Sequence, residues 1–279
     1  MRKPKAKQRA SALARGLFVA LLMFATLFPF YWTLIISLKN QNDAFQVPPD
    51  LFFMPTLENY QELFVTGNFG QYFFNSFVVC LLSIVLALLV GIPSAYIFAR
   101  CEFRFKKAFF YVLLITRMSP GAVFVIPYFI AYKEMGLLDT YLGLTLIYFA
   151  SNLGIIVWSL RAFMEDIPVS LEEAARIDGC SLLQTLFKIS IPLATPGIAS
   201  TAILSFIFSW NEFLFALLLT RNKIQTAPIG ILNFIVFEKM NWGVIAAGSI
   251  VIALPVVFFG VAIRKYYVKG LTQGGLAGD

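Results

Sequence analysis

The sequence predicts an all-α membrane protein with six transmembrane helices. Of its 279 residues, 59% are hydrophobic, and the mean hydropathy of +0.79 is too high for a soluble chain that buries its apolar side chains in one or two cores. Several apolar runs reach the ~20 residues that a helix needs to cross a bilayer. Many of the 18 Gly and 13 Pro residues lie inside these runs, a pattern that membrane helices tolerate.

The first apolar run is expected to be a retained membrane span. A basic tail, residues 1–16, precedes it as in a signal peptide, but the run 17–38 is longer than the apolar region of a signal peptide, and Lys39 follows it. Gly and Pro interrupt several later runs, and the third span is expected to be broken near Pro120. The six predicted spans are 17–38, 73–98, 108–132, 141–160, 198–219 and 244–263.

The distribution of positive charge predicts the orientation of these spans. Most of the 22 Lys and Arg residues lie in the two tails and in the segments that follow the second and fourth spans. By the positive-inside rule, these parts face the cytoplasm, and both termini lie there. The connection 39–72, with a short helix expected at 57–64, is then extracytoplasmic. Within the core, 73–263, the segment 161–197 forms a cytoplasmic loop. The tail 264–279 is cytoplasmic, and the N-terminal tail is expected to contact anionic membrane lipid.

The composition argues against several classes of function. The chain has no His, which removes His-based acid–base catalysis, Ser-His triads and zincin-type metal sites. Cys80, Cys101 and Cys180 have neither metal-site nor disulfide spacing. No G-x-x-x-x-G-K-[ST] motif is present, so we expect no P-loop and no cofactor in this chain. The net charge of +7 sits beside apolar runs and forms no basic helix, which argues against nucleic acid as a partner.

A polar stretch between the fourth and fifth spans, 170–192, is expected to form two short helices. An S-x-x-E pattern at 170–173 and an S-x-x-Q pattern at 181–184 have the spacing of capping boxes. Gly179 lies where a left-handed helix stop belongs, and Pro192 is expected to bar a simple continuation into the next span. Small side chains and a defined shape favour docking into a cleft of another protein. The alternative is an amphipathic helix that lies on lipid headgroups.

This stretch also contains a long spaced pattern: Glu173-Ala174-Ala175, Gly179 and Ile189-Ser190-Ile191-Pro192. It resembles the EAA loop of the integral membrane subunits of ABC importers, with Ile191 where Leu is usual. Further stretches fit the carbohydrate (maltose-type) branch: Asn75-Ser76, Tyr96-Ile97-Phe98-Ala99-Arg100, Trp210-Asn211-Glu212-Phe213 and Gly270-Leu271-Thr272-Gln273-Gly274-Gly275. The resemblance covers nearly the whole chain, and only the last four residues, 276–279, depart from the usual tail.

The resemblance implies the type I ABC importer permease fold in a bacterial or archaeal plasma membrane. It implies a permease subunit that forms half of the pathway for a sugar or related polyol. The implied partners are ATPase subunits that bind ATP and Mg, a second permease subunit (usually a different chain, giving a heterodimer) and an extracytoplasmic solute-binding protein. The chain itself would not be an enzyme. The implied ATPase-docking residues are Glu172, Glu173, Ala174, Ala175, Asp178, Gly179, Ile189 and Pro192.

Polar residues inside the predicted spans are the other candidates. Charged groups in a span are costly and face a bundle interior or a wet cavity. A solute pathway could be lined by Arg117, Asn152, Trp210, Asn211 and Glu212. The alternative is that these groups make interhelical polar contacts that fix helix packing. A rival function is an ion-coupled secondary transporter of a small polar solute, although no convincing internal repeat is visible and Glu212 is the only carboxylate within a predicted span.

Overall fold

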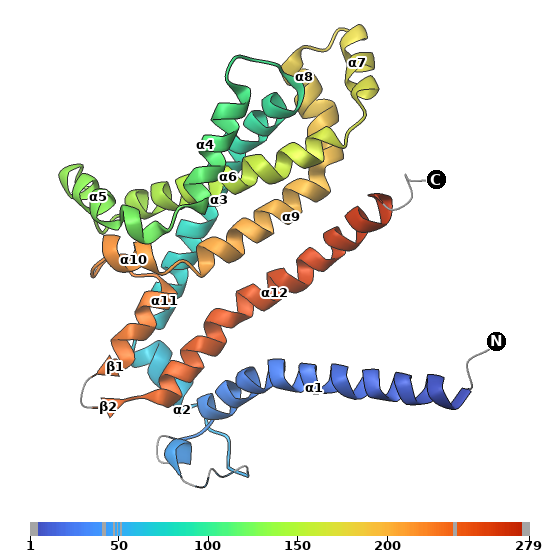
Figure 1. Cartoon of the computed structure of the whole chain (residues 1–279). Coiled ribbons are helices and arrows are strands. Elements are labelled where there is room, and N and C mark those ends of the chain that lie inside the picture. Colours follow the sequence, from blue (N-terminus) through green and yellow to red (C-terminus); the bar gives the residue numbers. More distant parts are fainter. Residues whose placement is uncertain are drawn as a thin grey trace. The chain divides into compact units, whose positions relative to one another are not determined.

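The computed structural model describes residues 5–40, 43–46, 48, 50, 52–236 and 239–274 (Figure 1). The chain divides into two compact units, and each is described by itself. Unit 1 comprises Met1–Phe69 and Ile231–Val251. Unit 2 comprises Gly70–Gly230 and Ile252–Asp279.

Unit 1 contains a long first helix, short helical turns and a small antiparallel hairpin. Its elements are α1 Lys5–Ser37, η1 Asp43–Phe45, α2 Glu58–Gln61, the π-helical turn η2 Glu62–Thr66, η4 Ile231–Phe234, β1 Ile235–Val236, β2 Lys239–Met240 and the start of α12 Trp242–Gly274. The strands pair with Val236 opposite Lys239. The short helix expected at 57–64 is present as α2 and η2.

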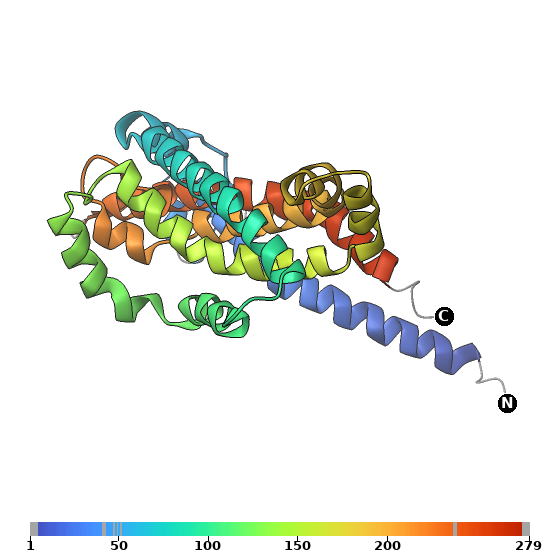
Figure 2. The ribbon, with the colours of Figure 1, turned by 90° about the horizontal axis from the view of Figure 1, so that it is seen from above.

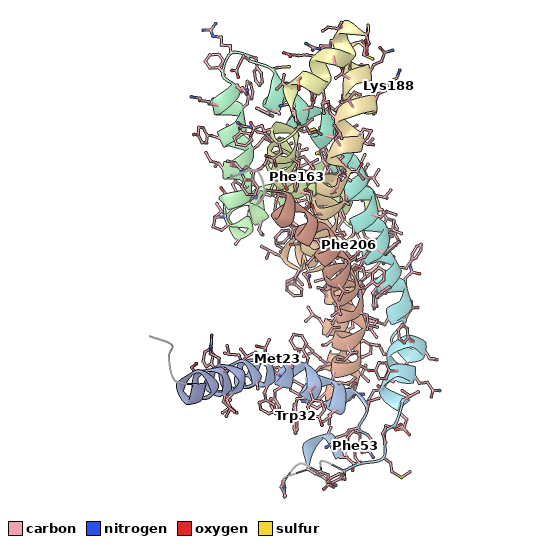
Figure 3. The ribbon with its side chains drawn as sticks, turned by 90° about the vertical axis from the view of Figure 1, so that its right-hand side faces the viewer. Met23, Trp32, Phe53, Phe163, Lys188 and Phe206 are labelled. Atoms are coloured by element: carbon pink, nitrogen blue, oxygen red, sulfur yellow. The ribbon has the colours of Figure 1, made fainter. Side chains whose placement is uncertain are left out.

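The end of α1 is held by the connection that follows it. The Asn59 amide, which is buried, donates to the carbonyl oxygens of Ser37 at 3.0 Å and Lys39 at 2.6 Å. Lys39 is itself buried, donates to the carbonyl oxygen of Asp50 and lies 5.1 Å from the ring centroid of Phe53. Between Leu13 and Leu34, α1 presents many exposed apolar side chains, as Met23 illustrates (Figure 3). A helix with this surface requires lipid or a partner chain to cover it.

Unit 2 is a helical bundle with a helical loop at one end. Its elements are α3 Phe69–Arg100, α4 Lys106–Met118, α5 Gly121–Glu134, α6 Tyr141–Glu165, α7 Val169–Ile177, α8 Leu182–Thr185, the π-helical turn η3 Leu186–Ser190, α9 Ile191–Trp210, α10 Leu214–Leu219, α11 Ala227–Gly230 and the second part of α12. Figure 1 shows α7 and α8 together at one end of this unit, with α5, α10 and α11 away from that end.

Five helical stretches in the described part of the chain are long and apolar enough to cross a membrane: Ser11–Ser37, Phe69–Arg100, Tyr141–Glu165, Leu182–Trp210 and Trp242–Ile263. The third predicted span, 108–132, consists of two helices, α4 of 13 residues and α5 of 14 residues, which confirms the expected break near Pro120. The backbone is extended at Ser119, and Pro120 follows, so the helix breaks and changes direction there (Figure 2). Neither half alone reaches the ~20 residues of a spanning helix.

The fifth predicted span differs from expectation. It was predicted to run continuously over 198–219, but α9 ends at Trp210, and α10 begins only at Leu214. The carboxylate of Glu212 accepts backbone N–H bonds at the start of α10, which stabilises the interruption. At the other end, the expected stop at Pro192 is wrong. The wider π-helical turn η3 leads directly into α9, and Pro192 falls in the first turn of α9, where a missing N–H is tolerated.

The core of unit 2 runs along α3, α6 and α9. Phe206 of α9 is buried, stacks on Trp210 with ring centroids 5.4 Å apart and packs against Phe259 of α12 (Figure 3). Nearer the loop, α9 approaches α6 so closely that a Cβ atom at Gly197 would lie 2.3 Å from the ring of Phe163. This close packing fixes the helices on which the loop is mounted.

Candidate functional site

The two-helix loop between α6 and α9 takes its shape from local capping. The caps expected in the middle of the loop are present, but the cap expected at its start is absent. Gly179 has φ of +87°, and the amide of Cys180 donates to the carbonyl oxygen of Ala175, which completes a left-handed C-terminal cap. Ser181 and Gln184 form a reciprocal capping box on α8, which confirms that prediction. The capping box predicted at 170–173 is wrong, because α7 begins at Val169 after Pro168 and no side chain caps it.

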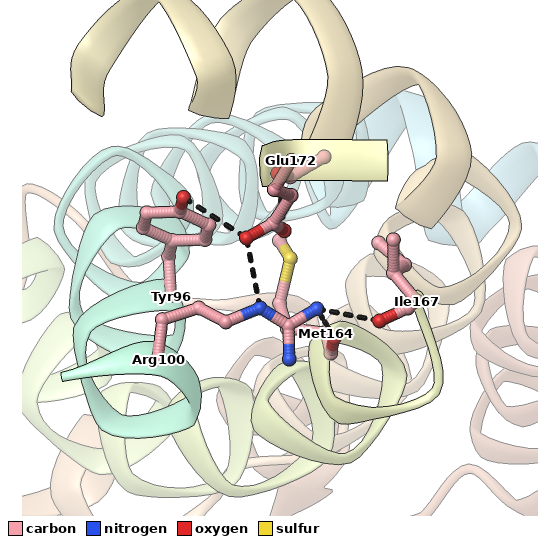
Figure 4. Close-up of polar contacts among 6 residues, drawn as sticks. Tyr96, Arg100, Met164, Ile167 and Glu172 are labelled. Carbon is pink, nitrogen blue, oxygen red and sulfur yellow. Dashed lines mark hydrogen bonds and ion pairs between the residues drawn. The ribbon is translucent and has the colours of Figure 1, made fainter. Parts of the chain in front are cut away.

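Glu172 is buried at the base of α7, and its carboxylate bonds to three side chains. One oxygen accepts from the guanidinium Nε of Arg100 at 2.9 Å and from the hydroxyl of Tyr96 at 3.2 Å (Figure 4). The other accepts from the hydroxyl of Ser190 at 2.9 Å. The site therefore joins α7 to α3 and to η3 through one carboxylate.

Arg100 extends this network to the end of α6. One terminal nitrogen of its guanidinium donates to the carbonyl oxygens of Met164 and Ile167, each at 2.7 Å (Figure 4). These carbonyls lie at the C-terminal end of α6, where the helix dipole favours a cation. The side chain of Arg100 is 12% exposed, and that of Glu172 is 6% exposed, so water screens the ion pair little.

The remaining residues of the predicted docking set lie mainly on the surface of the loop. Glu173, Ala174, Asp178, Gly179 and Pro192 are exposed, Ile189 is partly buried, and Ala175 is buried. Large apolar side chains share this surface, with Ile177 86% and Phe187 62% exposed. Lys188 also projects outward (Figure 3). Consecutive carboxylates thus have opposite placements, Glu172 inward and Glu173 outward.

Two of the predicted pathway residues make contacts that hold helices together. Asn152 is buried and donates to the carbonyl oxygen of Tyr148 and, at 2.6 Å, to the hydroxyl of Ser209 on α9. Trp210 is 1% exposed, and its indole N–H donates to the carbonyl oxygen of Ile252 in α12 at 3.0 Å. Both geometries fit the alternative expectation, in which these polar groups fix helix packing.

The other predicted pathway residues are placed differently from one another. Asn211 is exposed and donates to the carbonyl oxygen of Ile207. Glu212 accepts from the amides of Phe215 at 2.9 Å and Ala216 at 3.1 Å. It also lines a cavity of about 500 Å³, together with residues of α4, α5, α6 and α10. The side chain of Arg117 lies outside the described part of the structure. The described members of the set therefore do not converge on one surface.

Sequence reasoning missed the role of Asp139, which holds the other end of unit 2. Its carboxylate accepts backbone N–H bonds from four consecutive residues, Arg221 to Ile224, at 3.0–3.3 Å. Its own amide donates to the carbonyl oxygen of Leu219. Burial alone would raise the pKa of this carboxyl, but the four amides outweigh it and hold the pKa below its ordinary value. A sequence signal was available only in the residue type, since Asp tolerates the positive φ of 56° found here.

Comparison with known proteins decides the family. Residues 87–271 match the model of the binding-protein-dependent transport system inner membrane component. The chain belongs to this family. It is accordingly a permease subunit of an ABC importer, a multi-pass protein of the inner membrane and not an enzyme, and it works with a solute-binding protein.

Relatives of this permease are similar along nearly their whole length. The trehalose transport system permease protein SugB of Mycobacterium tuberculosis is 38% identical over 90% of this chain and 93% of its own. The trehalose/maltose transport system permease protein MalG of Thermococcus litoralis is 34% identical over 93% and 94%. A chain from the crystal structure of a bacterial ABC transporter involved in the import of the acidic polysaccharide alginate superposes with a TM-score of 0.80 at 22% identity, covering 96% of this chain and 100% of that one. The fold is therefore the type I ABC importer permease fold.

Proposed function

We propose that this permease forms half of the transmembrane pathway for a sugar or a related polyol. The support is that relatives of nearly equal length are named for sugar transport, among them SugB and MalG. A second permease chain, different from this one but related to it, would supply the other half, so that the two chains form a heterodimer. The bias of Lys and Arg supports a cytoplasmic location for both termini and for the loop 161–197.

The loop carries the second part of the proposal, which is docking of a separate ATPase. The single observation that supports it is the exposed helix α7, which ends in a left-handed turn at Gly179 and whose outward face combines Glu173, Ala174 and Ile177. Small side chains allow close backbone approach, and an exposed carboxylate offers a partner for a basic residue of the cleft. ATP and Mg would be bound by that ATPase and not by this chain. Glu172 is not proposed to contact the ATPase, because its buried carboxylate is already bound by Tyr96, Arg100 and Ser190.

Co-purification tests the assembly. The tagged chain is extracted in mild detergent, and the proteins that accompany it are identified by mass. We expect an ATPase chain and a second six-span permease, and uptake of the solute into proteoliposomes that is abolished by vanadate. A chain that emerges alone, with turnover that follows an ion gradient instead of ATP, would refute the proposal.

Charge reversal at the outward carboxylate tests the docking surface. Glu173→Lys is expected to lower uptake at least about tenfold, because it places a cation against the expected basic residue, while membrane insertion stays normal. The matched control is Glu165→Lys, a reversal at an exposed carboxylate at the end of α6, outside the two short helices α7 and α8. Normal uptake and normal ATPase co-purification by Glu173→Lys would remove Glu173 from the docking surface.

A further inference from the structure

We propose that the Arg100–Glu172 ion pair is the joint through which movement of α7 reaches the membrane helices. This inference rests on the proposed docking of an ATPase on α7. It assigns positioning roles to Tyr96, Arg100, Glu172 and Ser190, none of which contacts the transported solute in this account.

The first argument is how little else holds α7. Within this helix, Glu172 and Ala175 are the buried residues. Its larger apolar side chains, Val169, Leu171 and Ile177, are 47–86% exposed. A helix with so small an apolar footprint gains little orientation from packing. The polar bonds of Glu172 therefore set its position relative to the bundle.

The second argument is the set of elements that meet at this carboxylate. Arg100 and Tyr96 belong to α3, and the carbonyls that Arg100 also binds belong to the end of α6 and the turn after it. Ser190 is the last residue of η3, directly before α9. All three of these helical stretches, α3, α6 and the stretch that contains α9, are candidate membrane spans. A displacement of Glu172 is therefore passed to three spans at once.

The third argument is the kind of bond. Glu172 is bound by side chains, and Arg100 also binds two backbone carbonyls. The site is nearly dry, and charged hydrogen bonds are strong and directional there. A force on α7 is then transmitted by a stiff connection, whereas a water-filled or purely apolar contact would slide. Hydrogen-bond and ion-pair networks of this sort carry energetic coupling between distant sites.

The test measures coupling and not only activity. Glu172→Gln keeps the shape of the side chain and leaves Arg100 its two carbonyl acceptors, so the loop should fold. We expect normal co-purification of the ATPase and continued ATP hydrolysis, with solute transported per ATP reduced about tenfold. Glu172→Asp, which retains the charge, should recover part of the ratio. The matched control is Glu165→Gln, which alters an exposed Arg161–Glu165 pair at 2.8 Å and should leave the ratio unchanged.

Each outcome separates this inference from the proposed docking. An unchanged transport-to-ATP ratio in Glu172→Gln would overturn the joint. A parallel fall in transport and hydrolysis at a constant ratio would also overturn it, since that result means fewer folded complexes. Loss of ATPase co-purification in Glu172→Gln would show a docking contact and not a joint. If the unaltered chain captures no ATPase, the proposed docking itself fails.

Discussion

The two ends of unit 2 are each held by a carboxylate that joins distant segments, but their partners differ. Glu172 bonds to the side chains of Tyr96 and Arg100 in α3 and of Ser190 in η3. Asp139 bonds to consecutive backbone amides that begin 82 residues further along the chain. Backbone amides in one turn move together, so the Asp139 end is suited to be fixed. The network around Glu172 instead links α7 to three candidate membrane spans, so the Glu172 end is suited to transmit movement.

The comparison predicts the largest loss of stability from removal of Arg100. Arg100→Ala leaves the buried Glu172 carboxylate without a cation and should destabilise the loop by about 3–5 kcal/mol. Thermal unfolding of the purified complex in detergent measures this. Arg161→Ala, which breaks an exposed pair, is the control and should cost much less. Arg100→Ala with Glu172→Ala should recover part of the loss, and equal losses from Arg100→Ala and Arg161→Ala would contradict the assigned burial.

An intermediate loss is expected at the other end. Asp139→Asn removes the charge that the four amides solvate and should cost about 1–3 kcal/mol without changing the transport-to-ATP ratio. Because the folded pKa of Asp139 is lowered, its stabilisation is complete above the unfolded pKa of ~3.9 and is lost as pH falls through the folded value. The stability difference between wild type and Asp139→Asn should therefore begin to shrink below about pH 4 and vanish once pH is below the lowered folded pKa. An advantage that persists unchanged in acid would disprove this role.

The smallest effects are expected from two glycines with positive φ, one in each end. Gly179 (φ +87°) and Gly136 (φ +68°) both have open space where a Cβ would stand, so alanine costs about 1 kcal/mol of backbone strain in each. Their stability losses should match. Only Gly179→Ala, which strains the turn between α7 and α8, is expected to lower the solute transported per ATP. A change in the ratio caused by Gly136→Ala would mean that both ends take part in coupling.

Features governed by neighbouring residues could be predicted from the sequence. The turn at Gly179 and the Ser181–Gln184 box depend on residues within one helical turn, and both are present. The box predicted at 170–173 is absent, because α7 starts at Val169, which puts Ser170 inside the helix and not at its N-cap. The resemblance to the permease family drew attention to the stretch from Tyr96 to Arg100 and to Glu172, but did not connect them. Their convergence on one site required the fold.

Hydropathy was equally limited inside the membrane. It treats 198–219 as one apolar run, but the break after Trp210 depends on where the Glu212 carboxylate points. Hydropathy also does not distinguish Asn152 from Glu212, because both are simply polar residues within a predicted span. In the structure, Asn152 joins two helices, whereas Glu212 caps a short one and borders a cavity. Composition cannot distinguish such roles, because they depend on contacts between segments.

The opposite placement of Glu172 and Glu173 bears on how permeases could be re-engineered. Adjacent residues of a helix point about 100° apart, so the inner anchor and the outer surface of α7 are separate sets of side chains. The outward residues around Glu173 could then be exchanged for those of another importer, to redirect the choice of ATPase, while the anchor stays native. A transplant of the entire loop would be less tolerant, since an incoming carboxylate at position 172 needs an arginine in the recipient's α3.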